Sequence, residues 1–331
     1  MAKKYYEKID VLRGFAILLV VLGHALDQAN ILTDSVEWCN NLHAFIYSFH
    51  MPLFFAISGF CVFSISNYAQ FVKKKVRYIL LPYIVFNVII IPLRMLLPQF
   101  SLVSNGIKDT IVSILLYGGE TWFLYVLFII FLIAPLLIKI IANKINRFII
   151  VEVFLIVVYF LVHNITVFDL SQVIYYMIFF LAGNMLQKRE LIGEKNNFSR
   201  QVIFGGTLIV LLAQIGLLCV SRIVEDCVIL VLLLKILMAV VGCLFSYVFV
   251  DMITQKTIRG ALKNYGNYSL QIYLFNGYFI SLSRTVFLSM LGLPIPIVVL
   301  LNFVFGFFVN YIWCYLILKI PFARLLCGKR E

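Results

Sequence analysis

Long apolar runs follow one another along nearly the whole chain, separated by short polar segments. A helix needs about 20 predominantly apolar residues to cross the hydrocarbon core of a bilayer. By that measure the pattern predicts about ten spanning helices, with approximate limits 11–29, 43–65, 77–98, 110–138, 148–165, 172–187, 202–221, 227–250, 267–290 and 295–320. The expected fold is all-α: a polytopic transmembrane helix bundle that forms one integral membrane domain over residues 1–331.

Two of these runs contain residues that interrupt a regular helix. Met51-Pro52 and Ser58-Gly59 lie inside the second run, which predicts a kinked or partly re-entrant segment. Ser58-Gly59 also permits close packing between helices, and no base is placed near Ser58 to make it a nucleophile. Gly118-Gly119 interrupts the fourth run, so the part before it is a candidate interfacial segment.

The composition fits a lipid environment and changes how the charge is interpreted. Of the residues, 63% are hydrophobic and only 13% are charged, whereas soluble domains are nearer 45–50% apolar and about 25% charged. The net charge of +12 would suggest nucleic acid as a partner of a soluble protein. Here the basic residues lie in short loops between apolar runs, so we expect membrane lipid and no nucleic acid. The oligomeric state stays open.

The basic residues are distributed unevenly between alternate loops. Of the 27 lysines and arginines, 21 fall in the six segments that ten spans would place on one side, and 4 fall on the other. Cytoplasmic loops carry the excess of Lys and Arg. The sequence therefore predicts that both termini face the cytoplasm.

The first apolar run carries polar residues along one face. Asp10, Arg13, His24 and Asp27 are its only charged or titratable residues, and Arg13 and His24 are eleven residues apart. At about 100° and 1.5 Å per residue, those two lie on the same face, about 16 Å apart along the axis. Two interpretations stay open: interfacial anchors with a satisfied buried imidazole, or a functional seam, because polar groups inside spans are costly and often functional.

The second run adds a histidine next to its interruption. His50 precedes Met51-Pro52, and proline removes a backbone donor, which favours a cavity lined by His50. His43, near the outer edge, is expected to be interfacial. The four histidines lack the spacing of metal ligands, so no metal site is expected. Spacing alone does not establish a disulfide between Cys219 and Cys227.

Six segments follow one another along the chain: Ile9–Gly14, Val20–His24, Phe49–Phe60, Lys73–Tyr83, Gly119–Leu124 and Tyr265–Asn276. In this order they resemble the motifs of acyltransferase family 3, integral membrane enzymes that commonly O-acetylate bacterial surface glycans. The Phe49–Phe60 segment is similar to the subgroup that includes fucose 4-O-acetylases.

The resemblance implies a donor, an acceptor and roles for individual residues. The donor would be acetyl-coenzyme A or a related acyl thioester, attracted from the cytosol by Arg13, Lys74, Lys75 and Arg77, although the lysines and Arg77 equally fit simple topology signals. The acceptor would be a hydroxyl of a glycan or glycolipid at the bacterial cytoplasmic (inner) membrane.

The same resemblance makes His24 the general base, because histidine titrates near neutral pH, with Asp27 orienting the imidazole. Arg13 would hold the donor or pair with Asp10.

Four further residues are expected near the substrates. His50 would face the cavity, Glu120 would contact the acceptor sugar or act as a second acid, and Trp122 and Asn276 are candidate oxyanion donors together with Thr121. Two departures from the family pattern concern Asn276 and the donor-binding role of a second arginine. Asn276 stands where members often have histidine, and the basic loop lacks the usual Arg-x-x-Arg.

Ten helices with scattered charges also suit a transporter or flippase of a polysaccharide precursor. A scaffold subunit is a third alternative, but it would leave many intramembrane charges without a use. The first-helix seam and the His-Met-Pro segment favour the enzyme, because a transporter has no special need for them.

The charge distribution makes the topology testable. A cysteine introduced by Lys195→Cys into a variant without its native cysteines should react with a membrane-impermeant maleimide only after the membrane is permeabilised. Labelling of that residue in intact cells would contradict a cytoplasmic position for the loop between residues 188 and 200.

Overall fold

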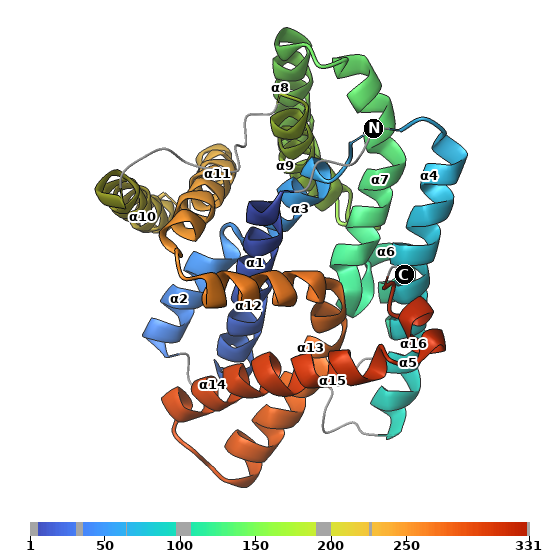
Figure 1. Cartoon of the computed structure of the whole chain (residues 1–331), viewed down its shortest axis with the longest axis vertical. Coiled ribbons are helices and arrows are strands. Elements are labelled where there is room, and N and C mark those ends of the chain that lie inside the picture. Colours follow the sequence, from blue (N-terminus) through green and yellow to red (C-terminus); the bar gives the residue numbers. More distant parts are fainter. Residues whose placement is uncertain are drawn as a thin grey trace. The chain divides into compact units, whose positions relative to one another are not determined.

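The computed structural model describes residues 6–30, 36–63, 65–96, 107–189, 200–224 and 227–329. These residues form helices and contain no strand. In chain order the α-helices are α1 Glu7–Asn30, α2 Glu37–Tyr47, α3 His50–Phe60, α4 Tyr68–Lys75, α5 Leu81–Leu96, α6 Ile107–Tyr117, α7 Trp122–Ile141, α8 Ile145–Val162, α9 Leu170–Lys188, α10 Arg200–Ile223, α11 Val228–Met252, α12 Lys256–Asn267, α13 Ser269–Arg284, α14 Ile295–Val304, α15 Asn310–Ile317 and α16 Pro321–Leu326 (Figure 1). Short 3₁₀ or π-helical segments are η1 Val76–Leu80, η3 Gly119–Thr121, η4 Val167–Asp169, η5 Thr285–Met290 and η6 Phe305–Val309.

The all-α, polytopic fold is confirmed. Within the described residues, eight helical segments are long and apolar enough to cross a membrane: Glu7–Asp27, Glu37–Phe60, Lys108–Ile141, Ile145–Val162, Val167–Lys188, Gln201–Ile223, Val228–Met252 and Ile295–Ile317. The other two expected spans correspond to α5 and α13, each 16 residues long and joined to a π-helical segment. The count of ten and the side of the termini stay predictions.

Both expected interruptions are present, and one lies at a slightly different place. The second span breaks before His50, between α2 and α3, so Pro52 falls in the first turn of α3, where a missing N–H is tolerated. Gly59 continues α3, and a Cβ on it would lie 1.8 Å from the Phe180 carbonyl oxygen. Gly118 and Gly119 take φ values of +72° and +59° and separate α6 from α7, a conformation that glycine adopts without strain.

The chain divides into two compact units, and each is described by itself. The first comprises Met1–Ile57 and Ile192–Cys314, and the second comprises Ser58–Leu191 and Tyr315–Glu331. The predicted functional residues divide between them. Arg13, His24, Asp27, His50 and Asn276 belong to the first unit, whereas Lys74, Lys75, Arg77, Glu120 and Trp122 belong to the second.

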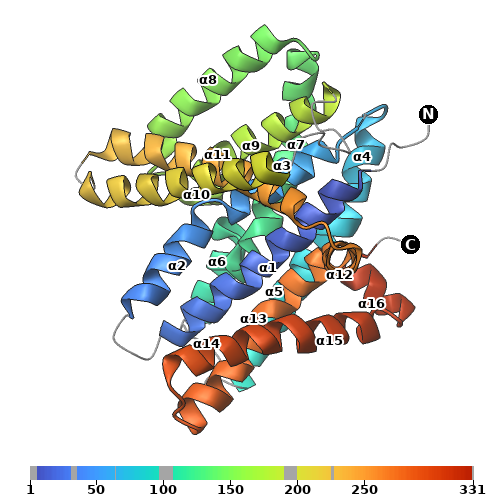
Figure 2. The same ribbon diagram turned by 60° about the vertical axis from the view of Figure 1, so that its left-hand side comes forward.

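The first unit is built on α1, which packs against α12, α13 and α14 (Figures 1 and 2), and Figure 1 shows α12 crossing α1. Glycine permits this crossing. A Cβ on Gly14 would lie 1.9 Å from the Leu262 carbonyl oxygen, and one on Gly266 would lie 2.3 Å from the Asp10 carbonyl oxygen. Because small residues allow helix backbones to approach closely, these two positions fix where α12 meets α1.

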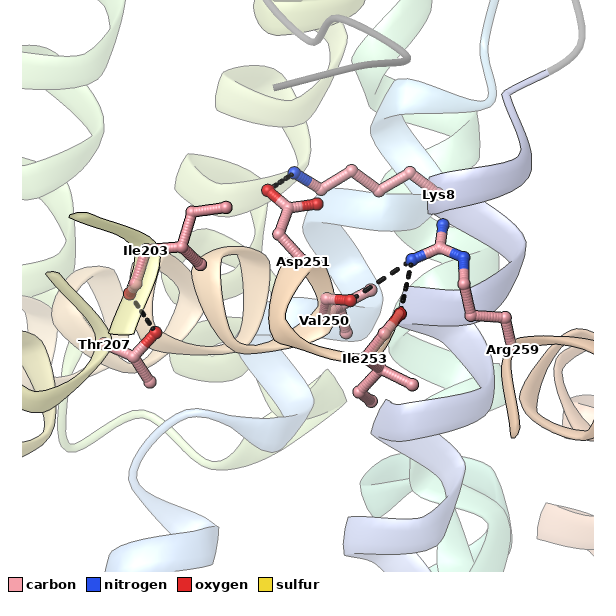
Figure 3. A network of polar contacts seen from close by, with 7 residues as sticks. All are labelled: Lys8, Ile203, Thr207, Val250, Asp251, Ile253 and Arg259. Carbon is pink, nitrogen blue, oxygen red and sulfur yellow. Dashed lines mark hydrogen bonds and ion pairs between the residues drawn. The ribbon is translucent and has the colours of Figure 1, made fainter. Parts of the chain in front are cut away.

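An ionic network joins the start of α1 to the end of α11 (Figure 3). Lys8 is 4% exposed and its Nζ lies 2.6 Å from Oδ2 of Asp251. The same ammonium group lies 3.2 Å from the centre of the Tyr247 ring. Arg259 of α12 donates to the carbonyl oxygens of Val250 and Ile253, 3.3 and 3.2 Å away. Buried charges require such partners, so the network constrains how these helix ends meet.

The second unit is built around α9, whose residues are mostly buried. The chain leaves α3 through a short non-helical segment that α9 holds in place. The Asn184 amide donates to the carbonyl oxygen of Val62 at 2.7 Å and to that of Gly59 at 3.3 Å. Beyond this segment α4 begins with Asn67 as its N-cap, which accepts from the Gln70 N–H at 3.0 Å, the usual role of a capping side chain.

Candidate functional site

The predicted polar seam of α1 begins with an ion pair. Nη1 of Arg13 lies 3.0 Å from Oδ1 of Asp10, one turn earlier on the same helix, and the two side chains are 25% and 18% exposed. Arg13 was expected either to hold the donor or to pair with Asp10, and the pairing with Asp10 is present. The side chain still reaches the surface, so the pair does not exclude a contact with a ligand.

His24 lies farther along the same helix, half-buried among other titratable groups. It interacts electrostatically with Asp27, one turn ahead, and with His43 of α2. Asp27 itself is exposed. The neighbouring Gly23 makes room for an aromatic ring, since a Cβ there would lie 2.7 Å from Cε2 of Tyr47. The short residue therefore lets α2 approach α1 beside His24.

Two more histidines join this group across the break between α2 and α3. The ring of His43 stacks on Tyr47 with centroids 3.7 Å apart, and Tyr47 meets His50 edge-on at 4.7 Å. His50 interacts electrostatically with both His24 and His43. We call His24, Asp27, His43, Tyr47 and His50 the histidine cluster. Its members come from three consecutive helices of the first unit.

The prediction that His43 is only interfacial is incomplete, because its ring belongs to this cluster. A signal for it was present in the sequence. His43, Tyr47 and His50 follow i, i+4, i+7 spacing, which places residues on one face of a helix. The short break before His50 does not remove that alignment.

The hydrogen bonding of His50 defines its tautomer. Nδ1 lies 2.9 Å from the Ile46 carbonyl oxygen, which can only accept, so the neutral ring carries its proton on Nδ1. Nε2 is then left with a lone pair and can accept a proton. Nε2 of His43 is buried and makes no hydrogen bond within the described part of the chain. The cluster thus contains imidazole nitrogens that no described side chain occupies.

Asn276 on α13 is 1% exposed, and its amide nitrogen and oxygen have no hydrogen-bond partner among the residues that the structure describes. Ile272 and Ile280, one turn to either side, pack in one core cluster with Val21 and other residues of α1. Asn276 therefore lies on the face of α13 that packs towards α1. An unpaired buried polar group costs roughly 1–3 kcal/mol, so this amide is a costly feature of the described structure.

The second unit holds Glu120 and Trp122 beside the turn that follows α6. Glu120 is exposed, and Trp122 is half-buried and stacks on Tyr176 with centroids 5.7 Å apart. Thr121 accepts a hydrogen bond from the Asn87 amide at 2.6 Å. This bond holds Thr121 through its hydroxyl oxygen, and Glu120 lies on the surface of this unit.

The basic residues of the second unit that are expected to bind the donor have different surroundings. Lys74 and Arg77 are exposed on α4 and η1. The Lys75 ammonium instead lies 3.4 Å from the centre of the Phe131 ring and 5.0 Å from that of Phe71. Such cation–π contacts hold a lysine against the protein. In the described ranges, no group of three or more His, Cys, Asp or Glu residues is arranged to hold a metal ion, and none of the seven cysteines forms a disulfide.

Comparison with known proteins adds a family to this geometry. A family model described as an acyltransferase domain matches residues 6–319. Nodulation protein NolL of Mesorhizobium japonicum is 29% identical over 133 residues, which cover 39% of this chain and 35% of that protein. Nodulation protein NolL of Sinorhizobium fredii is 30% identical over 131 residues, which cover 38% and 35%. Each match thus spans little more than a third of the relative's length. No solved structure matches.

The unpaired amide of Asn276 makes a stability prediction. Asn276→Leu replaces a buried group that has no hydrogen-bond partner by an apolar group of similar size, so the ligand-free protein should become more stable. Asn310→Leu is the matched control, because Asn310 is equally buried but donates to the Ile272 carbonyl oxygen at 3.0 Å. Thermal unfolding in detergent should show a raised midpoint for Asn276→Leu and a lowered one for Asn310→Leu. Equal destabilisation by both would contradict an unpaired Asn276.

Proposed function

We infer a function from the premise that this chain belongs to the acyltransferase family whose domain model matches residues 6–319. We propose that it transfers an acetyl group from acetyl-coenzyme A to a hydroxyl of a surface polysaccharide or lipid-linked glycan. The chain is a multi-pass integral membrane acyltransferase. The donor, the acceptor and the catalytic base are the parts that we propose in addition.

The histidine cluster is the observation that carries this proposal. A sugar hydroxyl is a poor nucleophile, so its transfer chemistry needs a positioned base with a pKa near the working pH. Histidine meets that need. His24 is half-buried on α1, interacts with Asp27, and stands within a group that includes two further imidazoles. Acetyl transfer to a hydroxyl would use the His24 imidazole of this cluster as its base.

In the proposed reaction His24 accepts the proton of the acceptor hydroxyl as its oxygen attacks the thioester carbonyl carbon. The carbon–sulfur bond of the resulting tetrahedral intermediate then breaks. The departing thiolate takes the proton from the imidazolium, which yields the ester and free coenzyme A with His24 restored. Asp27 stabilises the imidazolium through its charge, because an opposite charge nearby favours the protonated form.

Two other residues of the first unit fit supporting roles. Asn276 offers an amide N–H₂ without a hydrogen-bond partner in the described part of the chain, as an oxyanion donor requires. Arg13, held by Asp10, lies about 16 Å from His24 along α1, so it would contact a distant, polar part of the donor rather than the reacting carbonyl.

The sides of the membrane follow from the donor's chemistry. Acetyl-coenzyme A is a cytosolic polyanion, and the uneven distribution of Lys and Arg favours a cytoplasmic side for the segments between spans that carry most of the basic residues. We therefore place the protein in the bacterial cytoplasmic membrane, with the donor entering from the cytoplasm.

A pair of purified variants tests the assignment of the base. His24→Ala should lower acetyl transfer at least about a hundredfold, because a positioned general base contributes typically 10²–10⁴-fold. Binding of coenzyme A should change far less, because the phosphates are expected well away from His24. His50→Ala is the comparison, since His50 is 4% exposed in the same cluster and has an unprotonated Nε2.

Thermal unfolding of both variants controls for loss of fold. Near-normal transfer by His24→Ala together with an inactive His50→Ala would move the base to His50. If both variants retain transfer, the acid–base assignment fails. If the parent protein transfers no acetyl group to any glycan hydroxyl, a transport function replaces the enzymatic one.

A further inference from the structure

The second unit contains a cavity of about 590 Å³ that no predicted functional residue lines. That size is within the range of small-molecule sites, about 300–1,000 Å³. Its walls come from the segment after α3, the start of α4, the second half of α7 and the end of α9. Phe63, Tyr68, Lys139 and Lys188 are among the lining residues, and the rest are apolar except Ser66.

Side-chain contacts build this cavity rather than regular secondary structure. Asn184 and Lys188 of α9 donate to the carbonyl oxygens of Val62 and Phe63, which fixes the segment after α3. On the facing wall, the Tyr68 hydroxyl donates to the Leu132 carbonyl oxygen at 3.1 Å, close to Pro135, which cannot donate to the helical ladder of α7. The cavity is therefore held open by specific bonds on two sides.

The charge of the lining has one sign. Among the described residues that line the cavity, Lys139 and Lys188 are the two charged ones, and none is acidic. The Lys188 ammonium group donates one hydrogen bond to the Phe63 carbonyl oxygen. An ammonium group has three N–H donors, so Lys188 can also bind an anion. Lys139 is exposed. Charges of one sign in a concave, largely apolar site attract a ligand of the opposite charge. The two lysines would therefore attract an anion.

We propose that this cavity is a phosphate-binding site in which Lys139 and Lys188 supply the charge. Two sources share that chemistry: the nucleotide part of an acyl-coenzyme A donor, and the headgroup of an anionic phospholipid. The nucleotide source rests on the proposed function, whereas the phosphate site itself does not. The volume and the aromatic rings of Phe63 and Tyr68 suit a nucleotide better than a single phosphate group.

The site differs from the one that the sequence suggested. Lys74, Lys75 and Arg77 do not line the cavity, and Lys75 is engaged with two phenylalanine rings. The inference thus predicts that Lys139 matters more for the phosphate-bearing ligand than the basic run of α4 does.

The test uses the full-length protein in nanodiscs of neutral phosphatidylcholine, with coenzyme A as the probe in a calorimetric titration. Lys139→Gln should weaken binding roughly tenfold, because a hydrogen bond to a charged group is lost, and added salt should weaken binding by the parent. Lys144→Gln is the matched control: Lys144 is exposed just beyond α7 but does not line the cavity. Lys188→Arg tests the second lysine while keeping its charge, and should bind nearly as the parent does.

A second arm replaces part of the phosphatidylcholine by phosphatidylglycerol and follows thermal unfolding. Stabilisation by the anionic lipid that Lys139→Gln removes, with coenzyme A binding unchanged, would identify the headgroup as the source. If Lys139→Gln and Lys144→Gln behave alike in both arms, the phosphate site is overturned. These readouts need no acetyl transfer. A parent that binds coenzyme A through Lys139 but transfers nothing would refute the proposed function and leave this site standing.

Discussion

The close crossing of α1 and α12 is the contact on which the first unit depends. Lipid tails are as apolar as the helix surfaces, so no hydrophobic driving force brings membrane helices together. Close packing and polar contacts must therefore hold a membrane bundle together. Gly14 and Gly266 let the two backbones touch. A Cβ atom at either position would lie less than 2.5 Å from a backbone atom of the other helix. Because α1 also carries Arg13 and His24, this crossing positions the seam on which the proposed chemistry relies.

Inside that frame, the buried polar groups fall into two classes. Lys8, Asn310 and Ser283 have partners at 2.6, 3.0 and 2.7 Å in Asp251, the Ile272 carbonyl and Asn302, and these bonds hold helices together. Asn276 and Nε2 of His43 are buried without a hydrogen-bond partner in the described residues. Polar groups left unpaired at membrane depth are costly, which is why we propose an oxyanion-binding role for the Asn276 amide.

Apolar periodicity predicted the helical fold, and the positions of proline and glycine predicted both helix interruptions. The Asp10–Arg13 ion pair was one of two alternatives for Arg13. All of these features depend on neighbours within about one turn. What the sequence missed depends on tertiary contacts. Lys139 and Lys188 stood in the sequence as ordinary positive-inside residues, and only the packing of α7 against α9 brings them to one cavity. The sequence also did not indicate that the Lys75 ammonium group lies 3.4 Å from the centre of the Phe131 ring. Asn276 matched a family position, but its lack of a partner is visible only in three dimensions.

We propose that this membrane protein itself forms an ester between an acetyl group and a glycan hydroxyl. The most direct measurement follows isotopically labelled acetyl from coenzyme A in liposomes that contain only the purified protein and an acceptor glycan. We expect labelled glycan whose label mild base releases as acetate, together with an equal amount of free coenzyme A. Unlabelled glycan that crosses the bilayer while the label stays on coenzyme A would contradict it.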